Sequence, residues 1–151
     1  MRILFLTDTH IRAYSPVRRL DNFQETVFAK LTEVRRLAED LGADLVLHGG
    51  DLFDVNRVSN QLLGRTAELL RSFPCPILVV PGNHDLVGYS LASLPHTSLG
   101  VLYKAGVVDI ITEPVRLGSV VVWPVPAAPE IPADAYRTGL KGGLVIITAH
   151  D

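Results

Sequence analysis

Three short apolar runs punctuate the first half of the chain. They are Ile3–Leu6, residues 44–48 and residues 76–80. The second run has three apolar residues between Asp44 and His48. Short apolar runs that end abruptly in polar residues are typical of strands buried on both faces of a parallel sheet. Each of these runs is followed by a polar loop, so the pattern predicts three buried strands that deliver three polar loops.

A predicted helix lies between the first and second of these strands, and another lies between the second and third. From Leu20 to Leu41 apolar residues recur every three or four positions, which predicts a helix with one buried face; they are Leu20, Phe23, Val27, Leu31, Val34, Leu37, Ala38 and Leu41. Ser59 is a suitable N-cap for a second helix, which ends before Phe73-Pro74. The order strand, helix, strand, helix, strand predicts an α/β fold with a parallel sheet.

The second half of the chain is less regular. Residues 95–105 fit a short helix with Leu99, Leu102 and Tyr103 directed inward. Three apolar runs, at residues 107–111, 119–123 and 144–148, predict further strands around a proline-rich stretch. No repeat or linker divides the sequence, so we expect a single domain over residues 1–151.

Polar residues able to bind metal follow four of the predicted strands: Asp8 and His10, Asp51 and Asp54, Asn83 to Asp85, and His150. Any one of these clusters is explained as well by an ordinary solvent-exposed turn. Carboxyl ends of parallel strands share one edge of the sheet, where ligands usually bind. The repeated pattern therefore favours a single site.

The donor types indicate which metals such a site would hold. Carboxylate, imidazole and amide oxygen together suit Mn²⁺, Fe²⁺ or Zn²⁺, and a thiolate zinc site is excluded because Cys75 is the only cysteine. Two metal ions need a bridging carboxylate, for which Asp51 in the middle strand's loop is the natural candidate. His48, just before Gly49 and Gly50, is expected to be structural rather than a ligand.

Composition and charge indicate which partners and which cellular compartment to expect. A net charge of −2 and a pI near 6.2 argue against a strongly basic nucleic-acid-binding surface, although a local patch is compatible with that total. A lone cysteine suits a reducing compartment. The N-terminal apolar run is too short for a signal peptide or a membrane span. We therefore expect a cytoplasmic protein with no membrane association.

These motifs carry a resemblance to a known family. Asp8-x-His10, Gly50-Asp51 and the run from Gly82 to Asp85 resemble the first three motifs of the calcineurin-like metallophosphoesterases, and His150 resembles the fourth. The resemblance implies a four-layer αββα sandwich, of which the first half to two-thirds would be present. It also implies two divalent metal ions, most commonly manganese, with iron or zinc as alternatives.

The same resemblance assigns roles to residues. Asp8, His10 and Asp51 would bind one metal ion, and Asp51, Asn83 and His150 the other. His84 would face the scissile phosphate and protonate or stabilise the leaving oxygen. Asp85 would hold the imidazole of His84 in place.

The stretch from Gly50 to Ser59 resembles the SbcD-type nucleases of double-strand-break repair. That resemblance implies manganese-dependent phosphodiester hydrolysis on DNA and an SMC-like ATPase partner. Arg12 and Arg57, beside the first two loops, would contact DNA phosphates. Two alternatives stay open: a phosphodiesterase acting on small or cyclic nucleotides, and an inactive binding module that keeps the fold.

The family's last motif, Gly-His-x-His, is expected after His150, where this sequence has only Asp151. We therefore expect a domain truncated before that motif, or a degenerate member. Because two imidazole ligands would be missing, weak metal occupancy and little catalysis are expected of this 151-residue form. The predicted strand 144–148 would have an exposed edge, which favours a homodimer.

Overall fold

A computed structural model describes residues 1–117, 120–125 and 144–149. Four parallel strands form its first sheet, in the spatial order β1-β2-β3-β4. They are β1 (Ile3–Leu6), β2 (Leu45–His48), β3 (Ile77–Val79) and β4 (Asp109–Ile110). The parallel sheet predicted from the apolar runs is therefore confirmed, although the run at 107–111 contributes only two residues to it.

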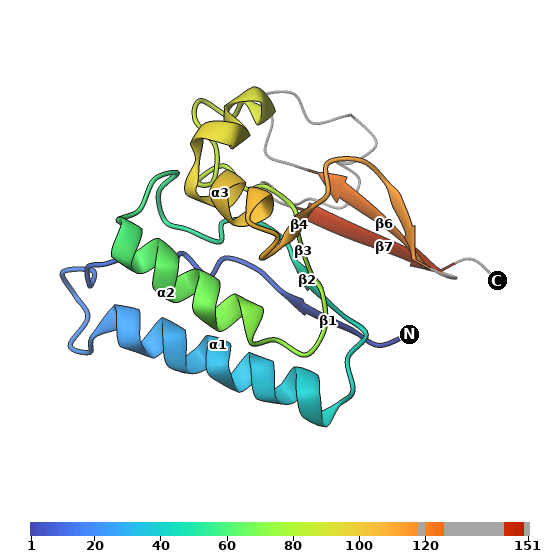
Figure 1. The fold of residues 1–151 in the computed structure, drawn as a ribbon, viewed down its shortest axis with the longest axis horizontal. Helices are drawn as coiled ribbons and strands as arrows, with labels where there is room; N and C mark the ends of the chain where they lie inside the picture. The colour runs from blue at the N-terminus through green and yellow to red at the C-terminus, as the bar shows by residue number, and fades with distance from the viewer. Residues whose placement is uncertain (118–119, 126–143, 150–151) are drawn as a thin grey trace.

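Three helices pack on one face of this sheet (Figure 1): α1 (Phe23–Asp40), α2 (Asn60–Arg71) and α3 (Ser98–Lys104). Asn22 caps α1 by accepting the N–H of Glu25, and Ser59 caps α2 by accepting the N–H of Leu62. The predicted start of the first helix is wrong by three residues. Leu20 precedes the cap and is fully exposed.

The predicted helix at residues 95–105 is two elements. A 3₁₀ helix, η1 (Leu91–His96), is separated from α3 by the extended residue Thr97. Pro95 cannot donate to an α-helical ladder, which favours this break. Leu99 and Leu102 are buried as predicted, whereas Tyr103 is about half exposed rather than directed inward.

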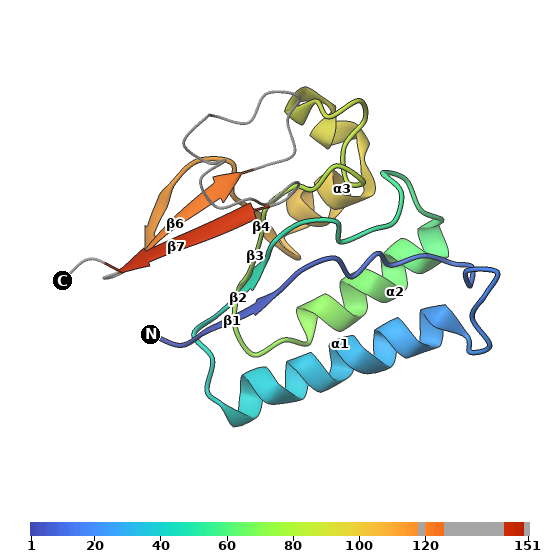
Figure 2. The ribbon, with the colours of Figure 1, turned by 180° about the vertical axis from the view of Figure 1, so that it is seen from behind.

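A second sheet packs on the opposite face of the first (Figure 2). Its antiparallel strands are β5 (Val115–Leu117), β6 (Val120–Val125) and β7 (Leu144–Ala149), in that spatial order. Val122 of β6 lies in a buried cluster with Leu45, Leu47 and Leu78 of the parallel sheet. The described residues thus form a helix layer and the two central sheets expected of the αββα sandwich.

The polar loops leave the parallel sheet at the carboxyl ends of β1, β2 and β3. Since neighbouring strands are in parallel register, their loops emerge side by side at one edge. Within the described residues, no helix is long and apolar enough to cross a membrane.

Candidate metal centre

The loops after β1 and β2 are joined by main-chain hydrogen bonds beyond the ends of the strands. The N–H of Asp8 donates to Gly50 O at 3.0 Å, and the N–H of His10 donates to Asp51 O at 3.0 Å. Ile11 N–H donates to Leu52 O at 2.9 Å. These bonds fix the positions from which the side chains of Asp8, His10 and Asp51 project.

Three of the predicted metal ligands have left-handed backbone conformations. The φ angles are 56° at Asp8, 43° at His10 and 54° at Asp51. Such conformations are uncommon outside glycine and cost on the order of 1–3 kcal/mol each. Non-glycine residues held in this region cluster at functional sites, and here the hydrogen bonds between the two loops maintain it.

The loop after β3 reaches the same centre through Gly82. A Cβ atom at Gly82 would lie 2.2 Å from Asp51 Oδ1 and 2.3 Å from Asp51 N, so only glycine permits this approach. The His84 N–H donates to Asp51 Oδ1 at 2.9 Å. Asn83, which is half-buried, lies between these two contacts.

Asp8, His10 and Asp51 form a group that could hold a metal ion. Each offers one donor atom, and these atoms all lie within 4.8 Å of one another. The Nε2 atom of His10 lies 3.7 Å from Asp8 Oδ1 and 4.0 Å from Asp51 Oδ2. Two carboxylates and an imidazole nitrogen on a constrained backbone fit a divalent transition-metal ion.

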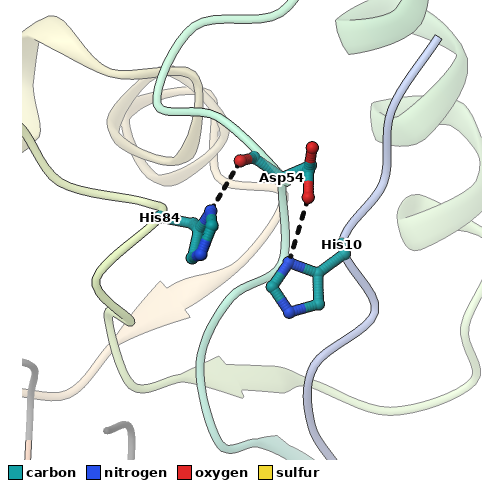
Figure 3. Close-up of side chains that lie close together, drawn as sticks. All are labelled: His10, Asp54 and His84. Atoms are coloured by element: carbon teal, nitrogen blue, oxygen red, sulfur yellow. Dashed lines mark hydrogen bonds and ion pairs between the residues drawn. The ribbon is translucent and has the colours of Figure 1, made fainter. Parts of the chain in front are cut away.

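A second group consists of His10, Asp54 and His84 (Figure 3). The Nδ1 atom of His84 lies 2.7 Å from the backbone carbonyl oxygen of Asp54. The rings of His10 and His84 meet edge to face, with their centroids 4.9 Å apart. The imidazole of His84 therefore lies beside the candidate metal ligands, and its backbone contact leaves Nε2 available.

Asp85 does not hold the imidazole of His84, so that expectation is wrong. The carboxylate of Asp85 is 1% exposed and accepts three backbone N–H groups, those of Leu52 at 3.3 Å, Phe53 at 3.2 Å and Gly82 at 3.0 Å. Burial raises the pKa of Asp85 to about 6, against the opposing effect of these donors. Asp85 thus fastens the second loop to the third.

His48 is structural, as expected. It is 2% exposed, its Nδ1 accepts the Gly50 N–H at 3.2 Å, and its Nε2 lies 3.1 Å from Thr9 Oγ1. The accepting Nδ1 carries no proton, so the neutral ring has its proton on Nε2. Burial lowers the pKa of His48 to about 4, which keeps the ring neutral at physiological pH.

The two arginines predicted to contact DNA occupy different settings. Arg12 is paired with Asp54 Oδ1 at 3.1 Å, and its side chain is 21% exposed. Its guanidinium lies over the rings of Tyr14 and Phe23. Arg57 is exposed and donates through Nε to the carbonyl oxygen of His96 at 2.9 Å. His150 lies outside the described residues.

With the geometry established, comparison with known proteins identifies the family. Residues 1–133, most of the chain, match the family described as Calcineurin-like phosphoesterase. The chain belongs to the calcineurin-like phosphoesterases.

Relatives of this calcineurin-like phosphoesterase are named as DNA double-strand break repair proteins. The Mre11 protein of Saccharolobus solfataricus is 27% identical over 136 residues, which cover 87% of this chain and 34% of the relative. The Mre11 protein of Nanoarchaeum equitans is 30% identical over 70% of this chain and 29% of its own length. Encephalitozoon cuniculi MRE11 is 29% identical over 94% of this chain and 27% of its own. The chain thus spans about a third or less of these relatives.

A solved structure supports the fold assignment of this phosphoesterase. The nuclease MPE of Pseudomonas putida superimposes with a TM-score of 0.52 over 77% of this chain and 50% of its own, at 17% sequence identity. At that level of identity the similarity concerns the fold alone.

Asp54 is the residue of this phosphoesterase whose role the sequence did not reveal. Its position in the polar run after β2 marked it as a candidate, but nothing in the spacing distinguished it from a turn residue. In the structure its carboxylate contacts His10, Arg12 and Tyr14, and its carbonyl oxygen contacts His84.

Proposed function

We propose that this chain carries the catalytic loops of a metal-dependent nuclease that hydrolyses DNA phosphodiester bonds in double-strand-break repair. The observation that supports this most directly is the convergence of Asp8, His10 and Asp51 from two different loops. Their donor atoms all lie within 4.8 Å of one another. The family match supports the reaction class, and the repair proteins among the relatives support DNA as the proposed substrate.

In this proposal Asp8, His10 and Asp51 hold one divalent ion, and Asp51, Asn83 and His150 hold the second. Divalent ions held by these residues would polarise the phosphoryl oxygens and would lower the pKa of a water molecule, which favours its hydroxide form as the nucleophile. Manganese is the proposed metal, with iron and zinc as alternatives, because the donors mix oxygen and imidazole nitrogen. Asp51, in the second loop, supplies the carboxylate that the two ions share.

His84 is the proposed proton donor to the leaving oxygen. Its Nδ1 faces a carbonyl oxygen, which can only accept a hydrogen bond, so Nδ1 carries a proton. Proton exchange therefore takes place at Nε2. When Nε2 is protonated, the ring can donate that proton to the oxygen that leaves as the bond to phosphorus breaks.

DNA backbone contacts are proposed for arginines on the exposed side of the first two loops. Arg57 is exposed, with its Nε bonded to a backbone carbonyl oxygen, and Arg18 in the first loop is also exposed. Arg12 is a weaker candidate because its guanidinium is paired with Asp54 and covered by two aromatic rings. Phosphate contacts of this kind would make binding salt-dependent.

Two assemblies accompany this function as proposals. An SMC-like ATPase partner follows from the resemblance to repair nucleases. A homodimer through β7 is supported by the position of this strand at the edge of the three-stranded sheet in the described part of the chain. Light scattering on concentrated protein tests the second, because a monomer at all concentrations would contradict it.

The deciding experiment measures hydrolysis of two substrates by the full-length protein that the gene encodes, with Mn²⁺ present. A labelled double-stranded DNA reports nuclease activity, and bis(p-nitrophenyl) phosphate reports general phosphodiesterase activity. We expect cleavage of DNA that EDTA abolishes and that Asp51→Asn removes. The matched control, Asp40→Ala on the exposed end of α1, should keep full activity.

The His84→Ala variant separates proton donation from metal binding. DNA hydrolysis should fall by about 10²–10⁴-fold, the usual contribution of a general acid. Hydrolysis of bis(p-nitrophenyl) phosphate should fall by less than about tenfold, because p-nitrophenolate leaves without a proton. Cleavage of small phosphodiesters without cleavage of DNA would contradict the nuclease proposal, and DNA binding without any hydrolysis would favour a binding module.

A further inference from the structure

Asp54 connects both histidines of the centre, and neither the motifs nor the family match assigns it a role. Its side chain, 13% exposed, lies with Oδ1 3.4 Å from His10 Nδ1, and its carbonyl oxygen lies 2.7 Å from His84 Nδ1. Figure 3 shows the two imidazoles approaching Asp54 from different loops. One residue therefore contacts the Nδ1 edge of both rings.

The two nitrogens of the His10 ring lie near different carboxylates. Its Nε2 faces Asp8 and Asp51, while its Nδ1 is directed toward Asp54. Nδ1 is buried and has no hydrogen bond of good geometry in the described part of the chain, so the Asp54 carboxylate is the acceptor available to it. Buried N–H groups are nearly always paired, and catalytic hydrogen bonds are often long before a ligand binds.

The carboxylate of Asp54 is itself held from the other side. Arg12 approaches Oδ1 at 3.1 Å, and the hydroxyl of Tyr14 donates to Oδ2 at 3.1 Å. The Arg12 guanidinium lies 5.6 Å from the centroid of the Tyr14 ring and 4.9 Å from that of Phe23. Residues of the first loop thus fix the rotamer of a residue of the second.

We propose that Asp54 is a positioning residue for His10, and that Arg12 and Tyr14 serve to hold Asp54. When the Asp54 carboxylate accepts a hydrogen bond from the Nδ1–H of His10, the Nε2 atom of His10 carries no proton and faces Asp8 and Asp51. This is the tautomer that binds a metal ion. That this edge of His10 serves a metal ion rests on the proposed function, whereas the orientation of the ring does not.

The direct test is the tautomer of His10, read from ¹⁵N chemical shifts of the ring nitrogens in the metal-free protein at alkaline pH, where imidazoles are neutral. We expect a protonated Nδ1 and a bare Nε2. In Asp54→Ala the population should shift toward the Nε2–H tautomer. Asp54→Asn keeps an acceptor oxygen and should retain the wild-type tautomer, which a purely charge-based role would not allow.

Two controls keep the result interpretable. Asp40→Ala removes an exposed carboxylate from α1 and should change neither ring. His48, with its bare Nδ1, is an internal reference for intact loops. If Asp54→Ala disturbs His48 as well, Arg12→Gln provides the milder perturbation, which should populate some Nε2–H tautomer of His10. A wild-type His10 protonated at Nε2, or an unchanged ring in these variants, would overturn the proposal.

A titration of the full-length protein with Mn²⁺, followed by electron paramagnetic resonance, separates this inference from the proposed function. Asp54→Ala should weaken Mn²⁺ binding by about 10–100-fold relative to the wild type and to Asp40→Ala. Failure of the wild type to bind Mn²⁺ would contradict the proposed function and leave the tautomer result standing. Equal affinity of Asp54→Ala and wild type would contradict the positioning role toward the metal.

Discussion

Asp8, His10 and Asp51 combine two unusual properties, since each offers a metal donor and each has a positive φ. Asp and His tolerate the left-handed region better than most residues, but still at a cost. Asp8 is an exposed residue whose carboxylate accepts a hydrogen bond from the Thr7 hydroxyl at 2.8 Å. Its side chain therefore contributes little to the core. The strained backbone of Asp8 occurs at a residue that is a proposed metal ligand.

Substitutions at Asp8 separate backbone strain from the carboxylate. Asp8→Gly and Asp8→Ala both remove the carboxylate, but only glycine adopts a φ of 56° without strain. We expect Asp8→Gly to be more stable than Asp8→Ala by about 1 kcal/mol in urea unfolding, and both to lose Mn²⁺ binding. Equal stability of the two variants would show that this backbone conformation is not maintained in solution.

His48 gives a prediction for the dependence of stability on pH. Its pKa is about 4 in the folded protein against 6.5 in the unfolded chain. Between these values the unfolded chain binds a proton that the folded protein does not, so the stability that depends on neutral His48 is lost as the pH falls through this window.

The measurement compares the free energy of unfolding of the wild type and of His48→Gln over this pH range. The advantage of the wild type should be constant above pH 6.5 and should shrink below it, by up to about 1.4 kcal/mol per pH unit. The difference between the two proteins removes the contribution of Asp85, whose raised pKa acts in the opposite direction. A difference independent of pH would contradict the burial of a neutral His48.

At the scale of elements, the three loops are fastened to one another mainly through backbone groups. Asp85 in the third loop accepts N–H groups of Leu52 and Phe53 in the second, and the second loop accepts N–H groups of Asp8 and His10 in the first. The sequence predicted the strands, the loops and their common edge, because apolar runs and parallel topology determine these features. It could not predict that Asp85 serves the backbone rather than His84, because adjacent side chains diverge at a turn.

Gly82 tests how tightly the third loop must approach the second. Gly82→Ala would place a Cβ against the backbone nitrogen of Asp51, so we expect a loss of at least about 2 kcal/mol in urea unfolding. A methyl group at Gly64 in α2 would meet no neighbouring side chain or loop within 4 Å, and Gly64→Ala should stabilise the protein by about 0.5–1 kcal/mol. A tolerated Gly82→Ala would mean that the loops do not meet as described.

For the molecule as a whole, the predicted α/β class and the parallel sheet with its two helices agree with the structure, while several details differ. Helix boundaries shifted because Asn22, rather than periodicity, determines where α1 begins. Tyr103 and Leu37 fit the apolar period but are about half exposed, since a helix only partly covered by neighbours leaves the margins of its apolar face in solvent. These outcomes depend on long-range packing, which a local pattern does not encode.

The arrangement of layers explains why the centre forms where it does. Helices cover one face of the parallel sheet and the second sheet covers the other, so the carboxyl-end edge remains for the polar loops. Burial of the strands on both faces gives these loops a rigid base, which suits a site that must hold donors in fixed positions. The proposed function requires those donors to gather around one cation.

Anomalous diffraction at the manganese absorption edge, from crystals of the full-length protein soaked in Mn²⁺, is the most direct test of this requirement. We predict an anomalous peak bounded by Asp8, His10 and Asp51, which disappears in crystals of Asp51→Asn and persists in Asp40→Ala. The absence of a peak at this position in saturating Mn²⁺, or a peak located elsewhere on the protein, would contradict the account.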